Sequence, residues 1–166
     1  TYQNLNVPPT LISFACADGQ KKHIISPEFK QAGNNIYHFY HQNKENGLPD
    51  YETLKEVFDF VHQQIKAGNI VSVKTIKEGG AAVSLAKMCF GNYLGAEVEL
   101  AESQILEKNI GGFIIESKTE LAHSQFHKIG KVTEGKTLVI NKKAFELGKL
   151  LSAYTQTFEN LFPTAE

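Results

Sequence analysis

The clearest pattern of apolar positions along the chain predicts an amphipathic helix over residues 51–67. Apolar side chains recur there every three or four residues, while Lys, Glu, Asp and Gln occupy the opposite face. Pro49 and Asp50 precede this stretch and Gly68 follows it, which suits a helix start and a helix end. The apolar stripe consists of Leu54, Val57, Phe58, Val61 and Ile65.

Alternation with a period of two predicts strands on both sides of this helix. The expected strands are 10–17, 35–41, one beginning at residue 71, 94–100, 113–116, and a late hairpin made of 126–132 and 137–140. Further helices are expected at 26–30, 80–90, 102–107, 117–123 and 142–160. This order predicts an α+β fold, a three-layer sandwich around a mixed sheet.

The first expected strand, 10–17, is apolar or small on both faces. Alternating positions place Ile12, Phe14 and Cys16 on one face and Leu11, Ser13 and Ala15 on the other. A strand of this kind is usually covered on both sides. We therefore expect it to lie inside a sheet.

Residues 71–88 hold the stretch that carries the most chemistry, VSVKTIKEGGAAVSLAKM. A β-branched run leads through a polar link to Gly79 and Gly80, and a helix-forming segment follows. Free N–H groups at such a helix start suit a phosphate. A pair of glycines equally suits a tight turn that packs helix against strand, and the full glycine-rich fingerprints are absent. Both interpretations stay open on spacing alone.

Composition narrows the class of protein. The 166 residues carry a net charge of −1, which gives no basic surface for nucleic acid or membrane lipid, and no apolar run is long enough to span a bilayer. Cys16 and Cys89 are isolated in apolar runs, so we expect two buried thiols in a reducing cytoplasm. No Cys/His cluster has zinc spacing. We expect residues 1–166 to form a single domain excised from a longer polypeptide.

Several motifs in this order resemble one enzyme family. They are VPPTLISF at 7–14, ISPEFK at 25–30, AGN at 32–34, EGGAAVSLAKMCFGN at 78–92, NIGGFII at 109–115 and the tail at 158–164. Together they resemble formylglycinamide ribonucleotide amidotransferase, also called phosphoribosylformylglycinamidine synthase. The longest of these runs resembles the family's C-terminal domain of the aminoimidazole ribonucleotide synthetase type.

The resemblance implies a function for the whole enzyme. Such an enzyme is an ATP-dependent ligase of purine biosynthesis, which uses Mg²⁺ and activates the formyl amide oxygen of formylglycinamide ribonucleotide for attack by glutamine-derived ammonia. The resemblance also implies two partners in the same polypeptide, an ATP-binding N-terminal-type domain and a glutaminase domain. The isolated domain is expected to be inactive.

The resemblance also assigns roles to residues at the glycine turn. Lys74, Lys77, Gly79 and Gly80 would contact nucleotide or sugar phosphate, and Glu78 would hold Mg²⁺. The family's usual HDRSDGG run stands here as KTIKEGG, and no catalytic residue can be assigned. The alternative is a non-catalytic interface module with a vestigial nucleotide pocket.

Overall fold

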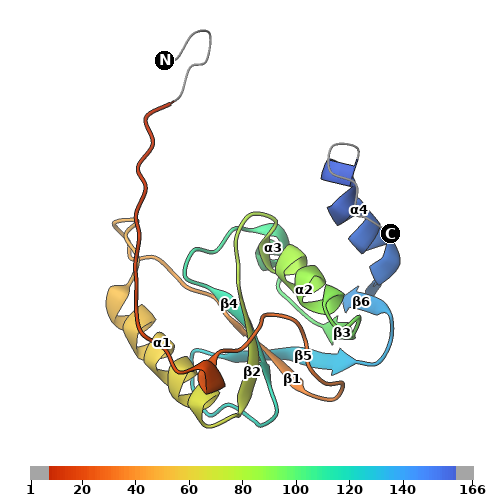
Figure 1. Cartoon of the computed structure of the whole chain (residues 1–166), viewed down its shortest axis with the longest axis horizontal. Helices are drawn as coiled ribbons and strands as arrows, with labels where there is room; N and C mark the ends of the chain where they lie inside the picture. The colour runs from red at the N-terminus through yellow and green to blue at the C-terminus, as the bar shows by residue number, and fades with distance from the viewer. Residues whose placement is uncertain (1–7, 160–166) are drawn as a thin grey trace.

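The computed structural model describes residues 8–159 and shows a mixed sheet with helices on both faces (Figure 1). The helices are the 3₁₀ turn η1 (Lys21–His23), α1 (Tyr51–Lys66), α2 (Gly80–Phe90), α3 (Glu102–Leu106) and α4 (Leu147–Glu159). The strands are β1 (Asn35–Phe39), β2 (Ile70–Thr75), β3 (Gly95–Val98), β4 (Phe113–Ser117), β5 (His127–Thr133), β6 (Thr137–Ile140) and β7 (Lys143–Glu146).

The seven strands follow the order β2-β4-β1-β5-β3-β6-β7. The pair β3–β6 is parallel and the other pairs are antiparallel. In Figure 1, α1 lies on one side of the sheet and α2 with α3 on the other. The α+β class, the mixed sheet and the three layers predicted from the sequence are confirmed.

Each face of the sheet carries its own apolar cluster. The cluster on the α1 side includes Val57 and Val61 of the predicted stripe, packed against Phe39 and Phe113. The cluster on the α2 side includes the fully buried Leu85 of that helix. This second cluster holds α2 against the sheet, so it fixes the position of the glycine turn that precedes the helix.

The two strongest periodic patterns were predicted well. Helix α1 matches the predicted 51–67 within one residue, and α2 begins and ends at the predicted residues. Phe58 is half exposed, so the stripe is narrower than expected. Burial of Cys89 raises the pKa of its thiol to about 12, as desolvation disfavours a thiolate. Cys16 is exposed, so the expectation of two buried thiols was wrong for it.

The predicted late hairpin was wrong in its pairing. Strands β5 and β6 both exist, but β3 lies between them and pairs with each. A Cβ on Gly95 would lie 2.2 Å from the Gly135 carbonyl oxygen, so β3 fits beside the 133–137 turn because residue 95 is glycine. Neighbouring strands in sequence are commonly neighbours in space, and this long-range insertion overrides that tendency.

The start of the predicted last helix was also wrong. Residues 143–146 form β7, which pairs with β6 in a tight hairpin. Asn141 and Lys142 have φ of 49° and 67°, the left-handed conformation that two-residue hairpin turns require. Asn141 tolerates this conformation, and its side chain is fixed by two hydrogen bonds of 2.8 Å to the backbone of Leu100.

The short helices predicted at 26–30 and 117–123 do not form. The buried carboxylate of Glu116 accepts hydrogen bonds from the backbone N–H groups of Lys30 (2.8 Å) and Gln31 (3.0 Å), and from Asn34 Nδ2 (2.7 Å). These tertiary bonds hold 26–34 as an irregular loop. The predicted capping residue Ser117 instead ends β4, with its hydroxyl bonded to Thr119.

The strand predicted at residues 10–17 does not form in this structure. Residues 8–20, which we call the arm, project from the body without regular structure, and every one of them is exposed (Figure 1). The tail residues 160–164 quoted for the resemblance lie outside the described range. No helix within residues 8–159 is long and apolar enough to cross a membrane.

Candidate functional site

Two glycine turns meet at one end of the sheet. The first, Gly79 and Gly80, joins β2 to α2, and the second, Gly111 and Gly112, leads into β4. The N–H of Ile76 donates to the carbonyl oxygen of Gly112 over 2.9 Å, so the two turns are in direct contact. The pairing of two such turns, which the sequence shows only as a repeated dipeptide, is therefore a feature of the fold.

The first turn is explained by backbone geometry and packing. Gly79 and Gly80 have φ of 85° and 67°, which side-chain-bearing residues rarely adopt. A Cβ on Gly80 would lie 2.5 Å from the carbonyl oxygen of Ile105, so the start of α2 lies directly against the backbone of α3. These contacts account for both glycines without a ligand, which is what the packing interpretation requires.

Glu78 lies at the exposed rim of this turn. Its Oε1 is 2.5 Å from the Nζ of Lys108, which precedes the second turn. The Lys108 ammonium lowers the pKa of the Glu78 carboxyl below its ordinary value. The ion pair links the two turns at the surface and leaves the carboxylate charged.

Lys74 and Lys77 occupy different positions beside the turn. Lys74 is half-buried on β2, whereas Lys77 is exposed and its carbonyl oxygen accepts the N–H of Gly80 over 3.0 Å. All five predicted site residues therefore lie along one short stretch at the end of β2. These residues lie close together because they are close in the sequence. Their roles in binding phosphate or Mg²⁺ remain a proposal.

The sheet adds residues that sequence reasoning did not assign to the site. Lys74 pairs with Ile114 of β4, Ile114 pairs with His38 of β1, and His38 pairs with His127 of β5. Residues paired across a sheet share a face, so these side chains form one row on the α2 side. Local patterns in the sequence give no signal for this row, because it depends on the pairing of strands far apart in the chain.

His38 is the most deeply buried titratable residue of this row, since Lys74 is half-buried and His127 is exposed. It is 2% exposed and its Nε2 has no hydrogen-bond partner among the described residues. Burial, with a smaller contribution from His127, lowers the pKa of the imidazole to about 4. A neutral, buried histidine agrees with the packing role that the aromatic pattern of β1 indicates.

The Asn109 side chain fixes the second turn to the end of β1. Its Oδ1 accepts the N–H of His41 at 2.8 Å, and its Nδ2 donates to the carbonyl oxygen of His41 at 2.7 Å. A Cβ on Gly112 would overlap the Asn109 amide, so glycine is required there as well. The site is thus held by side-chain bonds to backbone, which make it rigid.

The predicted magnesium role of Glu78 can be tested against its surroundings. Mg²⁺ is held by six oxygen ligands, often one or two carboxylates with waters and phosphates. Among residues 8–159 there is no group of three or more His, Cys, Asp or Glu side chains that could hold a metal ion. Glu78 would also have to release Lys108 to bind a cation.

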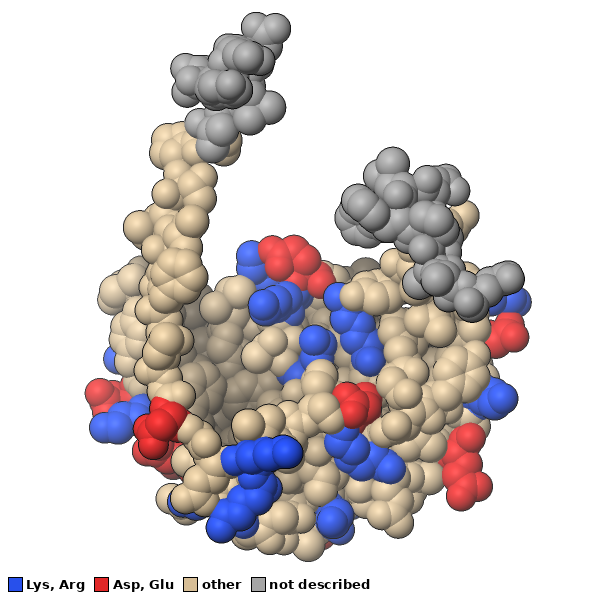
Figure 2. Space-filling view, in the orientation of Figure 1, with Lys and Arg blue, Asp and Glu red and all other residues tan. Residues whose placement is uncertain are grey.

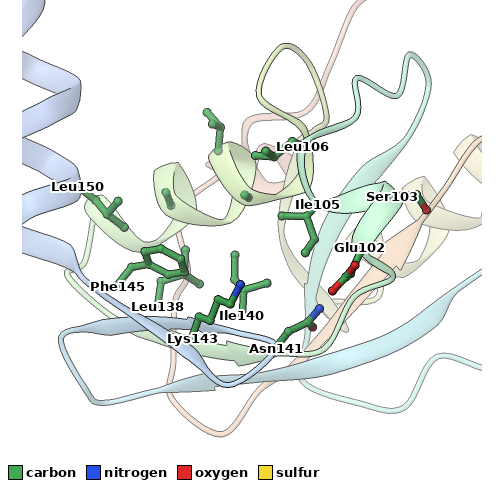
Figure 3. A pocket seen from close by; sticks show the side chains of 13 residues that line it. Glu102, Ser103, Ile105, Leu106, Leu138, Ile140, Asn141, Lys143, Phe145 and Leu150 are labelled. Carbon is green, nitrogen blue, oxygen red and sulfur yellow. The ribbon is translucent and has the colours of Figure 1, made fainter.

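A separate cavity of about 710 Å³ lies between α2, α3, the β6–β7 hairpin and α4 (Figure 3). Its walls are mostly aliphatic and come from α2, α3, the β6–β7 hairpin and α4, with Leu138, Phe145 and Leu150 among them. Leu106 joins the two regions, because its side chain lines the cavity while its backbone contacts Gly80. None of the five predicted site residues lines this cavity.

One face of the molecule is hollowed and charged. Figure 2 shows a concave face beside the arm, with Lys side chains and some carboxylates around it. Helix α4 stands beyond this face and is held to α2 by Tyr154, whose ring lies 4.8 Å from Lys87 Nζ and packs against Phe90.

No protein-family model matches the chain. It is 28% identical to the phosphoribosylformylglycinamidine synthase subunit PurL of Sulfurimonas denitrificans, over 92% of this chain and 24% of that protein. It is 35% identical to the PurL subunit of Methanocaldococcus jannaschii, over 48% of this chain and 11% of that protein. The chain spans about a quarter or less of the length of these relatives.

Solved structures agree in fold. The chain is similar to Thermotoga maritima PurL in complex with AMPPCP, with a TM-score of 0.63 and 13% identity over 78% of this chain and 27% of that one. The same Thermotoga protein has been solved with ATP, with ADP and with FGAR. The resemblance predicted from the sequence is therefore confirmed, and the chain contains a PurL-like domain.

Proposed function

We propose that the chain is the C-terminal-type domain of a phosphoribosylformylglycinamidine synthase. The enzyme would be an ATP-dependent ligase of de novo purine biosynthesis that converts formylglycinamide ribonucleotide to the amidine with glutamine-derived ammonia. The observation that carries this proposal is the likeness to PurL over almost the whole chain. The nucleotide and FGAR complexes of Thermotoga PurL support the choice of substrates.

The domain would work as part of a longer polypeptide. Its partners would be an ATP-binding N-terminal-type domain and a glutaminase domain, and the enzyme would act in the cytoplasm. ATP and Mg²⁺ would be held mainly by the partner domain, since this chain offers a single carboxylate at the predicted metal position. The exposed position of Glu78 and Lys108 beside the glycine turns supports a site shared between domains.

Within that shared site, Lys74 and Lys77 would neutralise phosphate charge, and the N–H groups at the start of α2 would point at phosphate oxygens. Helix α2 has no side-chain cap at this end, which leaves room for such a role. The isolated domain would bind no substrate strongly, because half of the site lies elsewhere.

A second candidate is favoured by one specific observation. The packing of Gly80 against α3 explains the most recognisable part of the motif without any ligand. On this reading the domain is a non-catalytic interface module of the same enzyme, and its nucleotide pocket is vestigial.

One experiment tests the enzyme assignment. The polypeptide encoded by the source gene should consume formylglycinamide ribonucleotide and ATP together, with either glutamine or a high concentration of ammonium as nitrogen donor. Production of the amidine without ATP, or no production with either donor, would contradict the assignment.

A second experiment separates the two roles of the domain. Lys74→Ala and Glu78→Ala in the active polypeptide should each raise the KM for ATP or substrate, or lower the bound nucleotide content. Lys55→Ala on the exposed face of α1 is the matched control. Unchanged activity and nucleotide content in both site variants would instead establish the interface module.

A further inference from the structure

The cavity between α2, α3, the β6–β7 hairpin and α4 plays no part in the proposed function. Its volume of about 710 Å³ falls within the range of pockets that hold small molecules. A helix is about 10 Å wide, so this volume would take fewer than about two of its turns, too little to seat a helix of another protein. The size of the cavity therefore favours a small molecule.

The inner walls of the cavity are apolar. Ala82 and Ala86 lie one turn apart on α2 and both face the cavity, which their small side chains leave open. Leu138 and Ile140 of β6 form its buried floor, with exposed fractions of 2% and 5%. An occupant would need an apolar group against these walls, because they offer it no hydrogen-bond partner.

Helix α4 forms the outer wall without closing the cavity. Leu150 lines the cavity, whereas Tyr154, one turn further along α4, packs against Phe90 with 5.8 Å between the ring centroids. The Nζ of Lys87 lies 4.8 Å from the centre of the same tyrosine ring. These contacts hold α4 against the C-terminal end of α2, so the space between the helices is part of their packing.

Two opposite charges stand at this cavity. Lys143 of β7 and Glu102 of α3 both line it and are exposed, and neither forms an ion pair with another residue of 8–159. Figure 3 shows their charged ends on the same side of the cavity, on either side of Asn141. The Asn141 amide is already bonded to the backbone of Leu100. An occupant therefore meets one ammonium and one carboxylate above an apolar floor.

This pair of charges selects the head group of the occupant. A simple anion would be attracted by Lys143 and repelled by Glu102, and a simple cation would meet the reverse. A zwitterion can pair its carboxylate with Lys143 and its ammonium with Glu102, and each contact is a charge-assisted hydrogen bond. The smallest common molecules with such a head and an apolar body are the apolar α-amino acids.

We propose that this cavity binds an α-amino acid with a large apolar side chain, its carboxylate on Lys143, its ammonium on Glu102 and its side chain on the floor of β6. The site is separate from the glycine turns, and the proposal does not rest on the proposed function.

Calorimetric titration of the polypeptide encoded by the source gene tests the chemistry of the ligand. Phenylalanine or leucine should bind. Three matched compounds should each bind at least about 10-fold more weakly: N-acetylphenylalanine lacks the cation, phenethylamine lacks the carboxylate and glycine lacks the side chain. The proposal is overturned if neither amino acid binds, or if any of the three compounds binds as tightly as phenylalanine.

Charge-removing variants test the location of the site. Lys143→Gln and Glu102→Gln should each weaken phenylalanine binding about 10-fold. Lys142→Gln and Glu99→Gln are the matched controls, since both residues are exposed and neither lines this cavity. Undiminished binding in both site variants, or equal losses in the control variants, would place the ligand elsewhere and overturn the proposal.

Hydrogen–deuterium exchange distinguishes a small molecule from a protein occupant. Phenylalanine should slow the exchange of the amides of residues 104–106, because α3 forms one wall of the cavity. If these amides are protected without it and phenylalanine changes nothing, a neighbouring domain or a second copy fills the cavity and the proposal is wrong. Amidine production is measured independently, so the enzyme assignment can fail while amino acid binding persists, and the reverse.

Discussion

Gly80 lies so close to Leu106 that a Cβ placed on the glycine would be 2.6 Å from the Leu106 Cα. The glycine pair that most resembles a phosphate-binding turn is thus also the point at which α2 and α3 touch backbone to backbone. A substitution at Gly80 would change both the packing of α2 on α3 and any ligand binding at the turn. A test of the ligand role therefore has to measure binding and folding separately.

Gly80→Ala should destabilise the domain by about 2–4 kcal/mol, because it combines a left-handed backbone conformation with a steric clash. Gly47→Ala isolates the conformational part, since Gly47 has φ of 77° and open space around it, and should cost about 1 kcal/mol. Urea denaturation measures both. Equal losses in the two variants would contradict the close packing of α2 on α3.

Glu116→Gln should destabilise the domain by about 1–3 kcal/mol, because the buried carboxylate accepts three N–H donors and an amide can accept at only one of its two positions. Glu97→Gln on the exposed face of β3 is the matched control and should stay within about 0.5 kcal/mol. Thermal denaturation of the purified chain provides the comparison. A small effect of Glu116→Gln would mean that the 26–34 loop is held mainly by Phe29.

His38 should make the domain less stable in mild acid. Its folded pKa of about 4 lies below the ordinary 6.5, so between these values the unfolded chain binds a proton that the folded chain does not. Stability is therefore complete above about pH 6.5 and falls as the pH drops toward 4, with about 3 kcal/mol lost in full.

The variant His38→Gln should flatten this part of the curve when unfolding free energies are measured by urea between pH 4.5 and 7. His41, whose pKa is also lowered by burial, would contribute any slope that remains. An unchanged slope in His38→Gln would show that other groups cause the acid sensitivity.

Lys108→Ala should raise the pKa of the Glu78 carboxyl toward its ordinary value, because the ammonium at 2.5 Å is the main cause of the lowered pKa. Carboxyl carbon chemical shifts followed by NMR over an acid titration would report the change. Lys128→Ala, which breaks a similar pair with Glu120, serves as the control and should leave the Glu78 titration in place. A constant Glu78 titration in Lys108→Ala would mean that the ion pair does not form in solution.

Local patterns in the sequence were enough to predict α1 and α2, because each has a long helical pattern with clear start and stop signals. They failed at residues 143–146, where the left-handed Asn141 and Lys142 start a hairpin that helix propensity hides. They failed again at 26–30, where the local helix signal is overridden by hydrogen bonds that backbone N–H groups donate to Glu116, a residue 86 positions beyond Lys30.

The candidate site was predictable in place but not in composition. The glycine pair could be found from spacing, and its flanking Lys and Glu residues were assigned from the family resemblance. Lys108, Asn109 and His38 could not, because strands far apart in the sequence bring them to the same end of the sheet. The close approach of α3 to Gly80 could not be predicted either. A glycine that makes space for a phosphate cannot be distinguished by sequence from one that makes space for a neighbouring backbone.

The strand order also governs when the protein can fold during synthesis. Strand β1 lies between β4 and β5, and β2 reaches the sheet through β4, so both early strands wait for residues 113 and beyond. Until the ribosome has made that second half, β1 and β2 have no partner and the apolar face of α1 has no sheet to cover. Folding of this domain is therefore late and cooperative, and a nascent chain that stalls near residue 100 would expose enough apolar surface to recruit chaperones.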